Sequence, residues 1–348
     1  MVLTMPQQTL AVIIPVFNGA ETLLRTLDSV VTQTRQPDEI VVVDDASTNP
    51  EMRELLENLA ASATYCEIPI KVLVNPVNAG VGAARNRGIL AAQADMLAFL
   101  DADDWWAPTH LQRSVEDLVR SGATFVASNF YAIGPDKKPV LQNCATIASR
   151  RECWNGGHHL WGPRTHYFYR GFIGILTVLV WREALIRAGG FDSQHRYALD
   201  WECWHAILAS TSRGFFYISP VPTAYYRLSS TGLTSRTMAR LAERESFLPR
   251  YVKDVAHMGG VWWPVLLFRG WLTVQYETLM PLWHKRAWAQ VARVVARAPA
   301  AWAWVWWQTL VMEPFGTGER PNFLAMVKST PALGVRAHEE VAPARLIA

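Results

Sequence analysis

Four short apolar runs, separated by segments with helical periodicity, constrain the fold of this chain more than any other feature. The runs are LAVIIPV, EIVVVDD, IKVLVN and MLAFLDADD, at residues 10–16, 39–45, 70–75 and 96–104. Between the first two, residues 20–33 place apolar side chains at 23, 24, 27, 30 and 31, the spacing of one helical face. The alternation predicts βαβ units, and hence an α/β fold with a mostly parallel sheet flanked by helices.

Residues 80–93 and 108–120 also have helical patterns, the second with Pro108 placed to begin its helix. The pattern changes at about residue 123. From there ATFVASNFYAI and GFIGILTVLVWREAL predict strands, the second continuing into a helix, and a further helix begins near Asp200. FFYISPVPTAYYRL predicts a last strand.

Carboxylates gather where two of the predicted strands end. Asp44 and Asp45 end the second run, and Asp101, Asp103 and Asp104 end the fourth. Parallel strands end at one edge of a sheet, where open α/β folds bind ligands, so we expect the two clusters to share a crevice. Crowded carboxylates raise one another's pKa and favour a counter-ion. Their hard oxygen atoms suit Mg²⁺ or Mn²⁺, and such an ion suits a diphosphate.

Structural roles for these aspartates remain open at this point. Asp103 and Asp104 could complement the positive end of the helix that begins near Pro108. Asp44 and Asp45 could form a turn and cap before a helix near residue 51.

Four motifs in order carry a family resemblance from about residue 10 to about residue 235. They are VIIPVFNGAETLLRTLDSVVTQTRQPDEIVVVDDAS, NAGVGAARNRGILAAQADMLAFLDADD, VLVWREALIRAGGFD and LDWECW. Together they resemble the inverting nucleotide-sugar transferases of glycosyltransferase family two, which have the GT-A fold. The resemblance implies a hexosyltransferase that moves a sugar, from a UDP-sugar or another nucleotide sugar, to a saccharide or lipid-linked acceptor, as in polysaccharide biosynthesis. It predicts a nucleotide-sugar-binding half at 1–122, an acceptor-binding half at 123–235 and a helical extension at 236–348.

The resemblance implies roles for individual residues. Asp45 would accept the N3–H of uracil, with Asp44 beside it, and Asp101 and Asp103 would form the Asp-x-Asp motif. Asp103 and Asp104 would hold Mn²⁺ or Mg²⁺ against the diphosphate. The implied nucleotide-binding residues are Pro15, Phe17, Asn18, Asp44, Asp45, Asn78, Gly80, Arg85, Asp101 and Asp103.

Gly80 and Gly82 also suggest a dinucleotide fingerprint, but that motif follows the first strand and has a third glycine where this chain has Arg85. We therefore predict a glycine-opened helix whose N–H groups and Arg85 face the donor's phosphates or sugar. The alternative for Arg85 is a structural pair with a nearby aspartate.

Asp200 is the candidate general base, which would take the acceptor's proton as its oxygen attacks the anomeric carbon. Glu202 is a weaker competitor, and a helix N-cap is the structural alternative for Asp200. The family usually has an acid where this chain has Leu199. It also has a histidine after Tyr-Arg that can join the metal site, whereas Tyr226 and Arg227 here precede leucine and serines.

The lost histidine leaves a non-catalytic nucleotide-sugar-binding relative as an alternative. A nucleotidyltransferase is a weaker one, because IPVFNGAE lacks the expected glycine- and lysine-rich loop. His158, His159 and His166 are expected in an acceptor-side loop rather than at a metal. Trp105 and Trp106 could form a wall of the donor site or pack beneath it.

The C-terminal segment has a different surface chemistry. Residues 236–300 contain ten Lys or Arg and four Asp or Glu, interleaved with tryptophans. This pattern fits amphipathic helices at an anionic membrane surface, or helices packed on the catalytic domain or on a second subunit of a homo-oligomer. The longest uncharged run there has fifteen residues, whereas a spanning helix needs ~20.

Overall composition narrows the partners and the compartment. The net charge of +3 gives no reason to expect nucleic acid. The four cysteines include no Cys-x-x-Cys pair, and no basic leader precedes the first apolar run, so we expect a cytoplasmic protein, at most peripheral on the membrane. The identity of the sugar and of the acceptor is not encoded in any motif found here.

Overall fold

The computed structural model describes residues 8–142, 160–161, 173–197, 199–210, 215–229, 237–259 and 263–311. Its first half contains β1 (Leu10–Val16), α1 (Ala20–Val31), β2 (Glu39–Asp44), α2 (Pro50–Ser62), β3 (Thr64–Tyr65), β4 (Ile68–Val74), α3 (Val81–Ala91), β5 (Met96–Phe99), β6 (Trp105–Trp106) and α4 (His110–Ser121). Next come β7 (Phe125–Ile133), β8 (Pro139–Gln142), β9 (Leu160–Trp161), the 3₁₀ turn η1 (Ile175–Thr177), β10 (Leu179–Trp181), α7 (Arg182–Arg187), α8 (Leu199–Ala209) and β11 (Phe216–Arg227). Three long helices follow: α9 (Thr237–Gly259), α10 (Trp263–His284) and α11 (Trp288–Val311).

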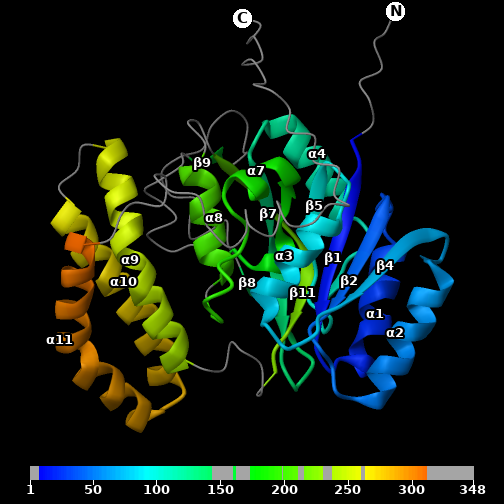
Figure 1. Ribbon diagram of the computed structural model, residues 1–348. Helices are drawn as coiled ribbons and strands as arrows, with labels where there is room; N and C mark the ends of the chain where they lie inside the picture. The colour runs from blue at the N-terminus through cyan, green and yellow to red at the C-terminus, as the bar shows by residue number, and fades with distance from the viewer. Residues whose placement is uncertain are drawn as a thin grey trace, which may run out of the picture.

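One mixed sheet forms the centre of the molecule, in the order β3-β4-β2-β1-β5-β10-β7-β11-β6 (Figure 1). Strands β4, β2, β1 and β5 are parallel, which confirms the predicted βαβ units. β10 is antiparallel to both β5 and β7, and β7 is parallel to β11. The carboxyl ends of β1, β2, β4, β5, β7 and β11 therefore lie at one edge of the sheet.

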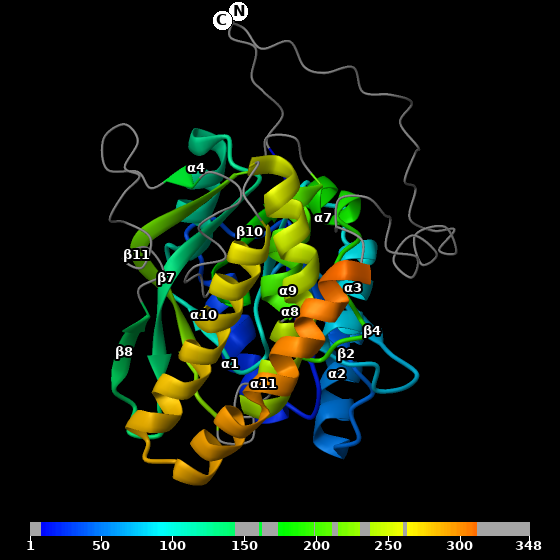
Figure 2. The same ribbon diagram turned by 90° about the vertical axis from the view of Figure 1, so that its left-hand side faces the viewer.

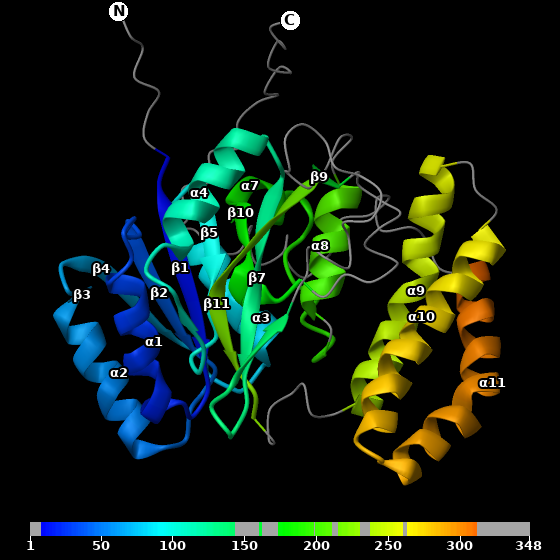
Figure 3. The same ribbon diagram turned by 180° about the vertical axis from the view of Figure 1, so that it is seen from behind.

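Burial on both faces explains why the first strands are almost entirely apolar. Every residue of β1 and β2 is buried, and helices cover the sheet on both sides, α3 on one (Figure 1) and α1 and α4 on the other (Figure 3). α3 approaches β1 closely at Gly88, where an added Cβ would lie 2.5 Å from Cγ2 of Ile13. Glycine is needed there for the helix to pack on the strand.

The three C-terminal helices pack together beside α8, with α10 and α11 facing the viewer in Figure 2. None of the helices within the described residues combines the length and the apolar character that crossing a bilayer requires. The helical extension was predicted from residue 236, and α9 begins at Thr237. The division into functional halves at 122/123 stays a prediction.

Candidate active site

The acidic turn after β5 is built around a buried carboxylate. Asp104 is 1% exposed, and its N–H donates to the carbonyl oxygen of Asp101 at 3.0 Å. One carboxylate oxygen accepts the backbone N–H of Arg227 at 2.8 Å, while the other has no hydrogen-bond partner. Thr26 of α1 donates its hydroxyl to the Asp104 carbonyl at 2.8 Å. Asp104 thus fixes the acidic turn to the end of β11.

Burial, and after it the crowding that the sequence predicted, raises pKa values in this turn. Burial, followed by the charge of Asp101, raises the pKa of Asp103 to about 6. Burial and then the charges of Asp103 and Asp101 raise the pKa of Asp104 well above its ordinary value. A cation beside the turn would relieve both effects.

Arg85 of α3 joins this turn to the second half of the domain. Its Nη2 donates to Oδ1 of Asp101 at 2.7 Å, and the guanidinium lies 5.4 Å from the ring centroid of Phe191. Its charge also lowers the pKa of Asp104 and of Asp200, although burial raises both. The structural pairing considered for Arg85 is therefore present, and the charge of Arg85 acts on both the acidic turn and Asp200.

Asp200 lies in the first turn of α8, partly buried, with Oδ1 accepting the N–H of Trp201 at 2.9 Å. Burial raises its pKa, whereas the charges of Arg85 and, more weakly, Arg240 lower it. Arg240 belongs to α9. The cations that lower the pKa of Asp200 thus belong to the first half of the sheet domain and to the helical extension.

Buried amide contacts position the segment that precedes α8. The side chain of Asn86 in α3 exchanges two hydrogen bonds with the backbone of Phe191, at 2.7 and 2.8 Å. Gly82, one turn earlier on α3, lies so close to Leu199 that an added Cβ would be 3.1 Å from its Cδ1. α3 therefore holds both Arg85 and the start of α8. Sequence analysis missed Asn86, whose only signal is a polar residue on a buried helix face.

The acidic pair after β2 shapes the neighbouring loops. Asp45 is buried and accepts the Nδ2 of Asn75 at 2.8 Å, the N–H of Ala79 at 3.0 Å and the N–H of Gly80 at 2.7 Å. Asp44 accepts the backbone N–H and the hydroxyl of Ser47, so the turn role considered for it is present. The cap of α2 is instead Asn49, which accepts the N–H of Glu51 at 2.8 Å.

The remaining predicted nucleotide-binding residues lie along the same edge. Oδ1 of Asn18 accepts the N–H groups of Thr48 and Asn49, at 2.9 and 3.0 Å, and so links the loops after β1 and β2. Phe17 and Asn78 are exposed, Pro15 is buried within β1, and Gly80 has a φ of +91° at the start of α3. Neighbouring strands lie ~4.8 Å apart, so the ends of β2 and β5, on either side of β1, are about 10 Å apart. The two acidic clusters lie at one edge of the sheet, and the crevice that they were expected to share stays a prediction.

This arrangement agrees with a family match. Residues 11–176, which include both acidic clusters and Arg85, match the sequence model described as "Glycosyl transferase family 2". By this match, residues 11–176 of the chain belong to glycosyl transferase family 2. Its mixed, mostly parallel sheet flanked by helices is the GT-A fold.

Curated relatives of this family 2 chain come from several bacteria. An uncharacterized glycosyltransferase of Nostoc sp. is 38% identical over 134 residues, which are 38% of this chain and 40% of the relative. Glycosyltransferase GlyA of Streptococcus pneumoniae is 32% identical over 35% of this chain, and the match spans 17% of that protein. The chain thus matches less than half the length of these two relatives.

A longer match and a structural likeness cover most of the chain. The Escherichia coli UDP-Glc:alpha-D-GlcNAc-diphosphoundecaprenol beta-1,3-glucosyltransferase WfgD is 24% identical over 72% of this chain and 89% of its own. The crystal structure of S. aureus TarS 1-349 in complex with UDP-GlcNAc has a TM-score of 0.58 at 16% identity, over 77% of this chain and 73% of TarS 1-349. The second likeness shows the fold alone.

Both tryptophans after the acidic turn of this family 2 domain pack against protein. Trp106 is buried, its Nε1 donates to the Leu176 carbonyl at 2.7 Å, and its ring stacks 4.6 Å from His110. Trp105 stacks 5.4 Å from Tyr225, and the Arg25 guanidinium lies 3.6 Å from its centroid. Of the two roles considered, packing is the one seen. His158, His159 and His166 lie outside the described residues.

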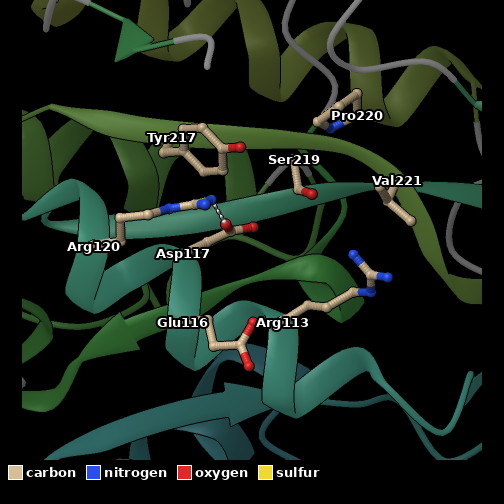
Figure 4. Close-up of a pocket in the computed structure, with 8 residues that line it drawn as sticks. All are labelled: Arg113, Glu116, Asp117, Arg120, Tyr217, Ser219, Pro220 and Val221. Carbon is tan, nitrogen blue, oxygen red and sulfur yellow. Dashed lines mark hydrogen bonds and ion pairs between the residues drawn. The ribbon is translucent and has the colours of Figure 1, made fainter. Parts of the chain in front are cut away.

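A hollow of about 290 Å³ between α4 and β11 contains none of the predicted site residues. Figure 4 shows its polar lining, in which Arg120 and Asp117 form an ion pair below Tyr217. It lies beside the amino-terminal half of β11, whereas Asp104 binds the backbone at the carboxyl end of that strand. The hollow is therefore separate from the candidate active site.

Proposed function

We propose that this family 2 glycosyltransferase moves a sugar from a nucleotide sugar, most simply a UDP-sugar, to an acceptor hydroxyl with inversion. The observation that carries the proposal is the position of Arg85. It contacts Asp101 of the Asp-x-Asp turn at 2.7 Å, and its charge lowers the pKa of Asp200, so one cation acts on both the proposed donor-side and the proposed acceptor-side carboxylate.

Asp200 is the proposed general base. Inversion requires a carboxylate that takes the acceptor's proton while the oxygen attacks opposite the leaving nucleotide. Burial raises the pKa of Asp200, which makes the carboxylate a stronger proton acceptor, and the charges of Arg85 and Arg240 oppose that rise.

Mg²⁺ or Mn²⁺ is the proposed cofactor, held by Asp103 and Asp104. The unpartnered oxygen of buried Asp104 and the raised pKa of Asp103 both fit a cation at this turn. Among the residues that the structure describes, no three His, Cys, Asp or Glu side chains are grouped to hold one metal ion. In the usual Mg²⁺ arrangement, one or two carboxylates bind the ion, and substrate phosphates and water complete the shell. When bound, the ion would stabilise charge on the departing diphosphate.

The proposed uracil contact of Asp45 is compatible with its internal hydrogen bonds. A carboxylate has about four acceptor positions. Oδ1 takes two donors, from Asn75 and Ala79, while Oδ2 takes one, from Gly80. One position on Oδ2 is left for the N3–H of uracil, and the loop 75–80 and the donor base would be ordered by the same side chain.

The proposed acceptor is a saccharide or a lipid-linked saccharide at the cytoplasmic face of a membrane. The support is the similarity to WfgD, which is named for a diphosphoundecaprenol-linked sugar acceptor and which this chain matches over 89% of its length. The C-terminal helices would bring the enzyme to that surface.

The direct test is metal-dependent UDP release with a panel of UDP-sugars and lipid-linked acceptors, with the product's anomeric configuration read by NMR. Asp200→Asn should lower kcat by at least ~100-fold, the contribution of a general base. Asp136→Asn makes the same chemical change in an exposed loop residue and should have no effect. Equal activity in the Asp200→Asn and Asp136→Asn variants would remove Asp200 from the mechanism.

A donor-binding protein without turnover is the second candidate, favoured by one observation. Arg227 ends β11, and the next residues are Leu228 and Ser229 instead of a histidine ligand. Calorimetric binding of UDP with Mn²⁺, in a protein that releases no UDP with any acceptor, would support this candidate over the transferase.

A further inference from the structure

The α10–α11 hairpin has one face inside the helical bundle and one face outside it. Leu267, Val274 and Val294 are buried on the inner side. Large apolar side chains of both helices are nevertheless half exposed: Phe268, Leu272, Tyr276, Trp283, Trp288, Val295, Trp304, Trp306 and Trp307. Exposed aromatic residues of this density indicate a surface that meets another phase or molecule.

The tip of the hairpin, residues 283–288, combines indoles with cations. Trp283 and Trp288 are 57% and 52% exposed, and their rings meet edge to face with centroids 4.8 Å apart. The three residues His284, Lys285 and Arg286 between them are all exposed. The turn itself is ordered, because Arg286 donates its N–H to the Trp283 carbonyl and Ala287 donates to Leu282, both at 2.9 Å.

The charge of the hairpin favours an anionic partner. Residues 263–311 contain the five basic residues Arg269, Lys285, Arg286, Arg293 and Arg297, and the single acidic residue Glu277. Arg297 is paired with Glu245 of α9, but the cations at the tip point outward with the two indoles. Trp at the headgroup level beside Lys and Arg is the composition of a lipid-facing interfacial segment.

The tip also lies at the end of the molecule where substrates are proposed to bind. β1 runs downward from the N-terminus in Figure 1, so its carboxyl end, which carries the donor edge, is at the bottom. The turn between α10 and α11 is at the bottom in Figures 1 and 3 as well. A planar surface touching the tip would therefore lie on the side of the sheet edge that bears the acidic turn.

We propose that the hairpin tip, residues 283–288, docks on an anionic phospholipid bilayer. The two indoles enter the headgroup region while Lys285 and Arg286 contact lipid phosphates. Docking through the tip would place the proposed active-site edge close to acceptors held in the membrane. Docking needs no sugar donor, so it can be tested apart from the proposed transfer reaction.

The test is co-sedimentation of the full chain with vesicles of phosphatidylglycerol and phosphatidylcholine, compared with phosphatidylcholine alone. The anionic vesicles should bind the protein, and binding should weaken as salt rises. Trp283→Ala/Trp288→Ala and Lys285→Glu/Arg286→Glu should each weaken it by roughly tenfold or more. Because all four side chains are exposed, the variants should keep the wild-type circular dichroism spectrum and melting temperature.

Trp307→Ala is the matched control, since it removes an indole that is 62% exposed near the opposite end of α11. It should leave vesicle binding unchanged, and equal losses in this variant and in the tip variants would overturn the assignment to the tip. Unchanged binding in the tip variants would also overturn it. A third result would overturn it as well: the wild type does not bind vesicles, and light scattering shows a dimer that only the tip variants dissociate. The tip would then contact a second copy of the chain.

Discussion

Glu243 of α9 accepts the backbone N–H of Tyr197 at 2.5 Å, and its other oxygen accepts that of Arg196 at 3.0 Å. These bonds fasten the segment three residues before Asp200 to the helical extension. Arg244, the next residue of α9, lies with its guanidinium 5.1 Å from the ring centroid of Trp201. The first C-terminal helix, α9, therefore takes part in building the candidate active site.

Glu243→Ala should lower kcat because it releases the start of α8. Misplacing a catalytic group by about 1 Å can cost up to ~100-fold in rate, so we expect a loss of about tenfold or more, with the donor KM little changed. Glu243→Gln should recover part of the rate, since an amide oxygen still accepts an N–H. Glu57→Ala, at an exposed position of α2, is the control. A Glu243→Ala enzyme with the wild-type kcat would show that the contact has no part in positioning Asp200.

Arg85→Ala should shift the pH dependence of kcat. The charge of Arg85 lowers the pKa of Asp200, so its loss lets burial raise that pKa further. A general base acts in its ionised form, and the rising limb of the pH–rate profile should therefore move to higher pH. Arg85→Lys keeps the charge but loses the planar fork that contacts Asp101, so it should keep the limb near its wild-type position while lowering the rate. An unmoved limb in Arg85→Ala would contradict the proposed coupling.

The long apolar runs made the sheet predictable from the sequence. The contacts that complete the site join residues far apart in the sequence, so no local pattern indicates them. β1 and β2 were expected almost at their observed bounds because strands buried on both faces leave little choice of residue. The insertion of antiparallel β10 between β5 and β7 has no such local signal, because pairing partners are chosen by tertiary packing.

The same limit applies to side chains of the site. Asp101 and Asp103 were found from a motif, but Glu243 lies 46 residues from Tyr197. The sequence left its helix open between a membrane surface and packing on the catalytic domain or a second subunit, and it indicated no particular contact. The role of Asp45 in ordering the loop at 75–80 was also missed. A motif match identifies the carboxylate but not its N–H donors, Ala79 and Gly80, which lie 34 and 35 residues away in the sequence.

His110 should make stability depend on pH. It is fully buried, and burial lowers its pKa to about 3, while its Nδ1 lies 2.7 Å from the hydroxyl oxygen of Thr223. In the unfolded chain histidine titrates near 6.5, so below that pH the unfolded state binds a proton that the folded state does not. The stabilising contribution is therefore present above pH 6.5 and is lost as the pH falls toward 3.

Urea denaturation from pH 7.5 to 4.5 measures this effect. As the pH falls below 6, the free energy of unfolding should decrease more steeply in the wild type than in His110→Gln. The slopes should differ by up to about 1.4 kcal/mol per pH unit, which is the value for uptake of one proton by the unfolded state. His284→Gln, which changes an exposed histidine, should keep the wild-type slope. Parallel curves for wild type and His110→Gln would mean that His110 takes up its proton in the folded state too.

A partly buried ion pair links α9 and α11 of the helical extension, and removing its cation should be costly. Glu245 of α9 is 1% exposed and accepts Nη2 of Arg297 from α11 at 2.6 Å and Nε2 of Gln275 from α10 at 2.5 Å. Arg297→Met should destabilise the bundle by about 2–4 kcal/mol, because it leaves a buried carboxylate without its cation. The change is read as the loss of helical circular dichroism in urea.

Glu245→Leu combined with Arg297→Met should restore much of that stability. An apolar pair of similar volume has no desolvation cost, so the double variant should lie within about 1.5 kcal/mol of wild type, although Gln275 then loses its acceptor. The difference between the double variant and the sum of the single ones is the coupling energy of the pair. Additive losses would show that the two side chains act independently, and would leave the packing of α9 against α10 and α11 to explain the cohesion of the bundle.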